Sequence, residues 1–152
     1  MTVADRLAEL GIELPAVAAP VAAYVPAVVH GDLVYTSGQL PFSGGALPST
    51  GKVGAEVSAE DANLYARTCA LNALAAAADA AGGVDRIAGV LRVGGFVASV
   101  PEFSGQPGVI NGASEVLGEI FGDAGRHARA AVGVPVLPLD SPVEVEVTFI
   151  LA

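Results

Sequence analysis

Residues 143–150, VEVEVTFI, alternate apolar side chains with polar ones. Successive side chains of a β-strand point to opposite faces of a sheet, so this alternation predicts a strand with two unlike faces. One face is apolar and the other polar, with Val143, Val145, Val147 and Phe149 on the first and Glu144, Glu146 and Thr148 on the second. The simplest interpretation is a half-buried strand whose polar face meets solvent.

A long helix is expected to follow Ser58. This serine is a good N-cap, strong helix formers continue from it to Ala81, and Gly82-Gly83 ends the run. Cys69, the single cysteine, lies in this alanine-rich stretch and is expected to be a small buried apolar side chain. One cysteine excludes an intramolecular disulfide.

The remaining patterns predict two more helices and four more strands. Residues 3–11 favour a short amphipathic helix, and Gly31 joins two short apolar runs in a hairpin. The expected strands cover 27–29, 33–36, 87–100 and 128–134, and a further helix covers about 108–121. The order β-β-α-β-α-β-β predicts a single α+β domain over residues 1–152, with two helices on one face of the sheet and a helical extension over residues 1–18.

The charge balance argues against nucleic acid and membranes as partners. There are 7 basic and 16 acidic residues, which give a net charge of -9. Such a chain repels phosphate backbones and anionic lipid surfaces. The N-terminus lacks the pattern of a secretory signal and no window is long and apolar enough to span a bilayer, so a cytoplasmic location is expected.

Hydrophobic residues make up 53% of the chain and charged residues only 15%. An interface between subunits would cover the excess apolar surface, so we expect an oligomer. The alternative is a simple enrichment in alanine and valine.

Arg129 lies among alanines and valines, where an unpaired guanidinium is costly to bury. Its anionic partner is either a strand glutamate, which would be a structural role, or the carboxylate of a ligand. His30 and His127 have no cysteine or carboxylate at metal-binding spacing, so no metal site is expected and each histidine is interpreted as exposed or hydrogen-bonded.

Four stretches, taken in order, resemble the RidA (YjgF) family of small reactive-imine deaminases. They are AYVPAVVHGDLVYTSGQLP at 23–41, GKVGAEVSAEDA, VINGASEVLGEIF, and the closing ARAAVGVPVLPLDSPVEVEV. The resemblance runs from roughly Ala19 to the C-terminus. It implies a chorismate-mutase-like α+β fold with a mixed sheet, assembled as a homotrimer with active sites in the clefts between subunits.

By the same resemblance, Arg129 corresponds to the residue that binds the substrate carboxylate and Glu144 to the one that positions the attacking water. The implied reaction is hydrolysis of 2-imino acids such as 2-iminobutanoate and 2-iminopropanoate, or of enamines such as 2-aminoacrylate, to 2-keto acids and ammonia, without a cofactor. The substrate-binding positions implied are Tyr24, Ser37, Gly38, Asn111 and Ala131.

The chain also departs from the family pattern. Ala131 stands where many members have cysteine, Gly112 where a bulky aromatic is common, and His127 where proline or alanine is usual. The segment from Asn111 to Arg129 is one residue longer. These departures affect the shape of the pocket and therefore the choice of substrate.

Two other functions remain open at this stage. One is a non-catalytic trimer that binds small carboxylates through Arg129, and the other is a pathway-specific activity on a different small acid. Ribonuclease activity is not expected, because the chain is acidic and has no basic patch interleaved with aromatic residues.

Overall fold

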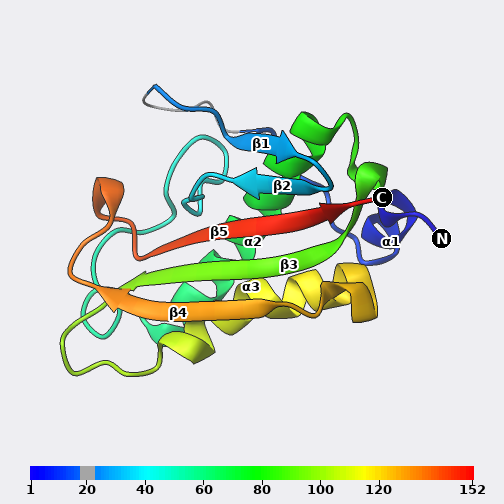
Figure 1. Cartoon of the computed structure of the whole chain (residues 1–152). Helices are drawn as coiled ribbons and strands as arrows, with labels where there is room; N and C mark the ends of the chain where they lie inside the picture. The colour runs from blue at the N-terminus through cyan, green and yellow to red at the C-terminus, as the bar shows by residue number, and fades with distance from the viewer. Residues whose placement is uncertain (18–22) are drawn as a thin grey trace.

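The computed structural model describes residues 1–17 and 23–152. A five-stranded sheet forms one layer, and two long helices lie against one of its faces (Figure 1). The elements in chain order are α1 (Val3–Glu9), β1 (Ala27–His30), β2 (Leu33–Thr36), α2 (Ala59–Ala81), η1 (Val84–Arg86), β3 (Ile87–Ala98), α3 (Gln106–Phe121), η2 (Gly122–Gly125), β4 (Ala128–Val134), η3 (Pro138–Asp140) and β5 (Val143–Leu151).

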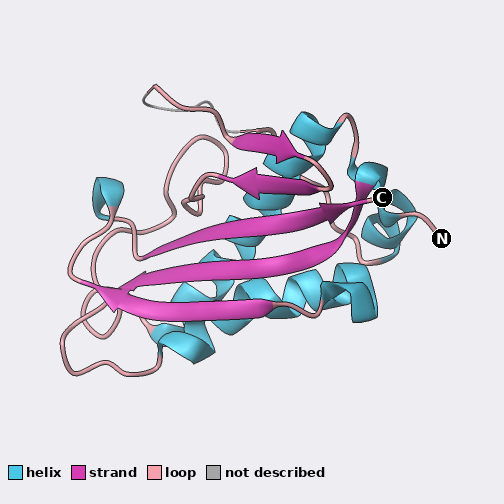
Figure 2. Ribbon diagram, in the orientation of Figure 1, coloured by secondary structure: helices cyan, strands magenta, loops and turns pink. Residues whose placement is uncertain are grey.

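The strands lie in the order β1-β2-β5-β3-β4. The β3–β4 pair is parallel and the other pairs are antiparallel, so the sheet is mixed. Both α2 and α3 cover the same face (Figure 2), which confirms the predicted arrangement of two helices on one side. We call the face that carries no helix among the described residues the open face. β4 is an edge strand, and none of the described strands pairs with its outer side.

Residues 143–150 form the predicted strand, with one apolar and one polar face. Val143, Val145 and Phe149 are completely buried against the helices, and Val147 is 2% exposed. The polar side chains between them lie on the open face and are half-buried. β5 occupies the middle of the sheet, so its polar side chains lie between neighbouring strands.

The signals at the ends of α2 are also confirmed. The Ser58 hydroxyl accepts the backbone N–H of Asp61 at 3.1 Å, and the helix ends at Gly82, whose φ of 91° is in the left-handed region. Cys69 is fully buried, as expected. Within residues 1–17 and 23–152, no helix is long and apolar enough to cross a bilayer.

The two long helices approach each other closely at Gly112. A Cβ atom added there would lie 1.9 Å from the backbone oxygen of Asn63 on α2. At the same place the Asn63 side-chain amide donates to the Gly108 carbonyl at 2.9 Å. The absence of a side chain at position 112 therefore sets the separation of α2 and α3.

Some boundaries differ from the sequence prediction. Helix α3 begins two residues before the predicted start, at Gln106, where Pro107 suits the first turn. The helical part of the N-terminal extension is only Val3–Glu9, because Gly11 follows its C-cap with a φ of 66°. Residues 12–17 are not helical, while residue 18 and Ala19 lie outside the described residues.

Candidate active site

Arg129 lies on the helix-covered face of the sheet. It pairs with Val93 of β3, which in turn pairs with Val147 of β5, and side chains paired directly across strands share a face. Both valines are buried under the helices. Because β4 is the edge strand, the guanidinium reaches the side of α3 and remains partly exposed.

Within the described part of the chain, the acceptors that hold the Arg129 guanidinium are uncharged oxygens. Its Nη1 donates to Asn111 Oδ1 at 2.8 Å and to Ser114 Oγ at 3.1 Å, and Nη2 donates to the Pro107 carbonyl at 3.4 Å. Among the described residues, no carboxylate lies within 4.0 Å of this arginine. The structural interpretation of Arg129 as the partner of a strand glutamate is therefore wrong, since Glu146 pairs with Arg92 at 3.7 Å instead.

Glu144 lies on the open face. It pairs with Phe96 of β3, which pairs with the exposed Val132 of β4. Burial raises the pKa of the Glu144 carboxyl above its usual value, and the negative charge of Glu146 on the same face raises it further. A carboxyl group of this kind can exchange protons nearer to neutral pH than an ordinary glutamate.

Gly38 brings the backbone against Glu144. A Cβ atom added at this glycine would lie 2.7 Å from Cδ of Glu144 and 2.8 Å from its Oε2. The segment after Gly38 is fixed by Asn72, a buried α2 residue whose amide donates to the carbonyls of Leu40 (3.0 Å) and Phe42 (3.1 Å). The backbone beside the carboxylate is therefore held by the core.

Ser37 fastens the chain before β1 to the same region. Its backbone N–H donates to the Pro26 carbonyl at 2.8 Å and its hydroxyl donates to the Val25 carbonyl at 2.6 Å. Tyr24 comes directly before this anchor and its side chain is 48% exposed. Ser37 and Gly38 thus belong to the Glu144 side of the molecule, and Tyr24 is the residue before the segment that Ser37 holds.

The predicted site residues form two groups on opposite faces of the sheet. The arginine group consists of Arg129, Asn111 and Ala131, because Ala131 pairs with Gly95 and Val145 on the helix-covered face. The glutamate group consists of Glu144, Gly38 and Ser37, and Tyr24 directly precedes Val25, to which the Ser37 hydroxyl donates. One copy of the chain therefore does not bring Arg129 and Glu144 together.

Ser114 and His127 were not predicted as site residues, yet they adjoin Arg129. Ser114 lies three positions after Asn111 on α3, a spacing that places both on one helix face. His127 is hydrogen-bonded to Ser114, as the alternative of a hydrogen-bonded histidine allowed. The helical spacing could have suggested Ser114, whereas nothing local in the sequence connects His127 to α3.

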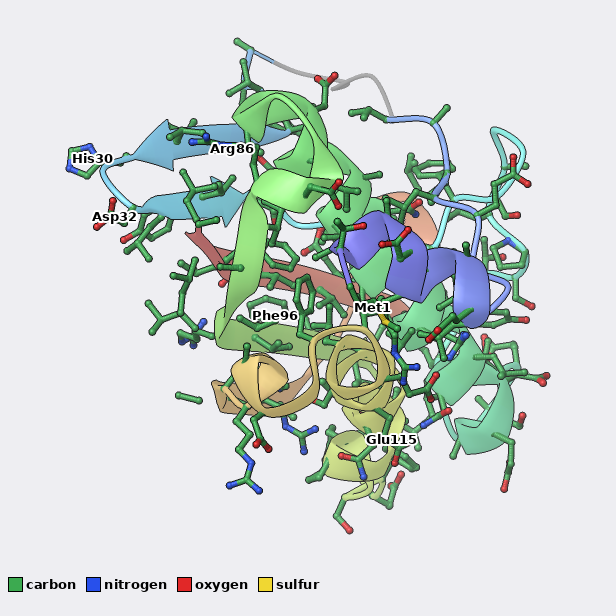
Figure 3. The ribbon with its side chains drawn as sticks, turned by 90° about the vertical axis from the view of Figure 1, so that its right-hand side faces the viewer. Met1, His30, Asp32, Arg86, Phe96 and Glu115 are labelled. Atoms are coloured by element: carbon green, nitrogen blue, oxygen red, sulfur yellow. The ribbon has the colours of Figure 1, made fainter. Side chains whose placement is uncertain are left out.

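The His30 side chain projects from the tip of the β1–β2 hairpin beside Asp32, far along the chain from His127 (Figure 3). Within residues 1–17 and 23–152, no three His, Cys, Asp or Glu side chains are grouped so that they could hold a metal ion.

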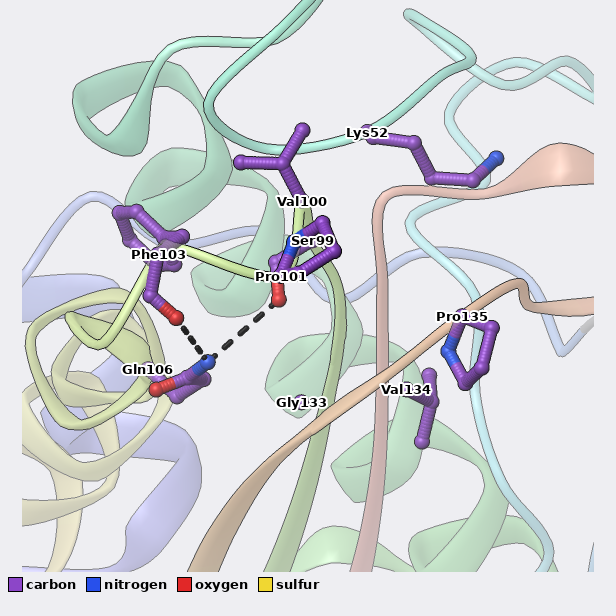
Figure 4. A pocket seen from close by; sticks show the side chains of 9 residues that line it. All are labelled: Lys52, Ser99, Val100, Pro101, Phe103, Gln106, Gly133, Val134 and Pro135. Atoms are coloured by element: carbon purple, nitrogen blue, oxygen red, sulfur yellow. Dashed lines mark hydrogen bonds between the residues drawn. The ribbon is translucent and has the colours of Figure 1, made fainter.

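A cavity of about 640 Å³ lies at the carboxyl ends of β3 and β4 (Figure 4). Gly133 lines it, and a Cβ there would come within 2.7 Å of the Gln106 amide nitrogen. That amide donates to the Phe103 carbonyl at 2.8 Å. None of the seven predicted site residues lines this cavity.

A family model described as "YjgF/chorismate_mutase-like, putative endoribonuclease" matches residues 4–150. The chain belongs to this YjgF family. The family match covers residues 4–150 and so includes most of α1, whereas the resemblance seen in the sequence began at roughly Ala19. The mixed sheet with two helices on one face is the YjgF/chorismate-mutase-like fold that the sequence predicted.

Individual YjgF relatives agree with this assignment. The chain is 44% identical to Protein TCP17 of Trypanosoma cruzi over 145 residues, which cover 95% of this chain and 91% of TCP17. It is also 44% identical to Atu1372 of Agrobacterium tumefaciens, a protein of unknown function, with a TM-score of 0.90 and coverage of 99% and 92%. TdcF of Escherichia coli, solved with bound serine, is 25% identical, with a TM-score of 0.63 and coverage of 90% and 94%.

Proposed function

We propose that this protein hydrolyses reactive 2-imino acids, or their enamine tautomers, to 2-keto acids and ammonia, in sites shared between the subunits of a homotrimer. The observation that carries the proposal is the half-buried guanidinium of Arg129, which is held by neutral oxygens and has no carboxylate partner within the described part of the chain. A cation in this setting is suited to an anionic ligand.

The hydrogen bonds of Arg129 favour a carboxylate. Both Nη1 hydrogens have acceptors, on Asn111 and Ser114, while Nη2 makes one long bond of 3.4 Å. None of the described residues accepts a hydrogen bond from Nε, so the Nε–Nη2 edge can donate two parallel hydrogen bonds to a carboxylate. The serine bound to TdcF, an amino acid with a carboxylate, supports this class of ligand.

The separation of the two groups supports a shared site. A small substrate cannot touch Arg129 and Glu144 of one subunit, because the sheet lies between them. In a cyclic trimer each subunit presents different surfaces to its two neighbours, so the arginine group of one copy can face the glutamate group of the next. The open face carries the exposed apolar side chains Val28, Tyr35 and Val132, which suit burial at such an interface.

The proposed reaction needs only water and these groups. Arg129 holds the substrate carboxylate and so fixes the adjacent imine carbon. Glu144 takes a proton from water as the water oxygen bonds to that carbon, and the imine nitrogen becomes an amine. Glu144 then passes its proton to this nitrogen, and as the C–N bond breaks the hydroxyl becomes the carbonyl and gives its proton back to the Glu144 carboxylate. Ammonia is released, and the proton on Glu144 passes to bulk water. The raised pKa of Glu144 suits these proton transfers, and the protonated imine is electrophilic without a cofactor.

The surface charges do not favour the ribonuclease activity that the family description mentions. Five of the seven basic residues lie within 4.0 Å of a carboxylate. The net charge of -9 adds a general repulsion of RNA. A non-catalytic carboxylate-binding trimer is the remaining alternative, and the proton-exchanging carboxyl of Glu144 beside Gly38 favours turnover over binding alone.

An amino acid oxidase that makes 2-imino acids in situ tests the proposal, with semicarbazide as the competing trap. We expect the wild type to lower semicarbazone formation, and Arg129→Ala and Glu144→Ala each to lose about a hundredfold or more of this activity. Matched control variants are Arg86→Ala and Glu115→Ala, at exposed positions outside both groups. If the wild type gives no acceleration over buffer with small, aliphatic or aromatic imines, the deaminase proposal fails.

A labelled RNA incubated in parallel is expected to stay intact.

A further inference from the structure

We infer that His127, acting through the hydroxyl of Ser114, is a positioning residue that fixes the orientation of the Arg129 guanidinium. This inference rests on the proposed function, since it concerns how Arg129 receives a carboxylate. It assigns a role to two residues that the predicted site did not include.

The hydrogen bonds around His127 have defined directions. Its Nδ1 lies 2.6 Å from the Gly125 carbonyl, which can only accept, so Nδ1 carries a hydrogen. In the neutral ring, Nε2 is then an acceptor. Ser114 Oγ lies 2.9 Å from Nε2 and therefore donates its hydroxyl hydrogen to it.

The direction of the Ser114 O–H bond determines whether Oγ presents lone pairs or a hydrogen to Arg129. With its hydrogen turned to His127, Ser114 Oγ presents lone pairs to Arg129 Nη1 at 3.1 Å. Asn111 Oδ1 accepts the other Nη1 hydrogen at 2.8 Å. The two acceptors hold Nη1 on α3, and Nη2 keeps only the long bond of 3.4 Å to the Pro107 carbonyl among the described residues. The bonds from Arg129 to Ser114, from Ser114 to His127 and from His127 to Gly125 thus form one chain that donates from the guanidinium toward the Gly125 carbonyl.

The three groups come from α3, from η2 and from the residue before β4. Ser114 lies in the middle of α3, His127 directly precedes β4, and Gly125 is a buried residue at the end of η2. The chain of hydrogen bonds therefore links the start of β4 to α3, and it lies beside the half-buried arginine rather than at the free surface.

Variants of His127 and Ser114 test the coupling, with the dissociation constant of 2-oxobutanoate and the kcat and KM of imine hydrolysis as readouts. His127→Phe removes the acceptor and is expected to raise both Kd and KM about three- to tenfold, with kcat changed less than about twofold. His127→Gln, whose amide oxygen can accept from Ser114, is expected to restore most of the affinity. Ser114→Ala and the double variant Ser114→Ala/His127→Phe are expected to match each other, because His127 acts only through the hydroxyl.

Imidazole ¹⁵N NMR at alkaline pH tests the same chain of hydrogen bonds in the wild-type protein. This test does not depend on whether the variants fold. The expected signature is a hydrogen on Nδ1 of His127, and the exposed His30 is the internal reference. His30→Phe is the matched control variant and is expected to leave Kd and KM unchanged.

A hydrogen on Nε2 of His127, or an unchanged Kd in a folded His127→Phe variant, would overturn the inference. If the wild type binds 2-oxobutanoate but hydrolyses no imine, only the proposed function is contradicted. The Kd values of the variants then still test the chain of hydrogen bonds. Wild type that does not bind 2-oxobutanoate would overturn the inference, since no carboxylate then reaches Arg129.

Discussion

Arg129 and Glu144 have different electrostatic environments in the fold. The arginine is surrounded by neutral acceptors that stabilise a guanidinium without neutralising it. The glutamate is half-buried next to a second glutamate, so its ionised form is disfavoured. In the proposed reaction, the first of these environments suits the binding of an anion and the second suits the exchange of a proton.

Glu144→Gln is expected to inactivate the protein and yet raise its stability near neutral pH. The folded-state pKa of Glu144 is raised from 4.5, so this group stabilises the fold below that value, and the stabilisation is lost as the pH rises through the raised pKa. Glutamine resembles the protonated form at every pH. Thermal unfolding should give the variant the higher Tm at about pH 7.5, with the difference closing at about pH 4. A lower Tm for the variant at the higher pH contradicts this account. Glu115→Gln, at an exposed position on α3, should show no such pH-dependent gap.

Gly38→Ala is expected to impair catalysis more than binding. The new Cβ would lie 2.7 Å from Cδ of Glu144, so the carboxylate has to move, whereas Arg129 on the other face is untouched. The expected result is a fall in kcat of about tenfold or more with little change in KM. Gly118→Ala, where a Cβ meets nothing within 4 Å, is the control and should keep full activity. An unchanged kcat in Gly38→Ala would remove Gly38 from the site.

At the scale of elements, the contact between α2 and α3 depends on one glycine. Gly112→Ala would place a Cβ 1.9 Å from the Asn63 carbonyl, a backbone atom that cannot rotate away. We expect a loss of about 3 kcal/mol in the free energy of unfolding, measured by urea denaturation. The matched variant Gly118→Ala on the same helix has open space and should be slightly stabilising, by about 0.5–1 kcal/mol. Equal stability of the two variants would show that the helices separate easily.

Local patterns predicted the elements because each element's signal lies within its own residues. The alternation at 143–150 identified β5, and Ser58 with Gly82 bounded α2, since capping and strand periodicity depend only on nearby side chains. The parallel pairing of β3 with β4 and the close approach at Gly112 were not predictable in this way. Both depend on packing between segments that are distant in sequence.

The candidate site shows the same division. The family motifs identified Arg129, Asn111 and Gly38. In the structure Asn111 is hydrogen-bonded to Arg129, and Gly38 lies against Glu144. That the two pairs lie on opposite faces follows from strand register, which no local motif specifies. The contact of His127 with Ser114 likewise requires the fold that brings η2 to α3.

At the scale of the whole molecule, the sheet has one face under helices and one open face with exposed apolar side chains (Figure 1). The glutamate group lies on the open face and the arginine group at the edge strand. The two groups thus face different directions, and in the proposed trimer each group would meet the complementary group of a neighbouring subunit.

Subunit complementation between Arg129→Ala and Glu144→Ala tests this central claim most directly. The two inactive variants are mixed in equal amounts, unfolded, and refolded together, and native mass spectrometry verifies that mixed trimers have formed. If Arg129 and Glu144 of one site come from different subunits, each mixed trimer contains one complete site of three. Imine hydrolysis should then return to about a quarter of the wild-type rate, since about three quarters of randomly assembled trimers are mixed. Mixed trimers that remain as inactive as the two parents would contradict the shared site.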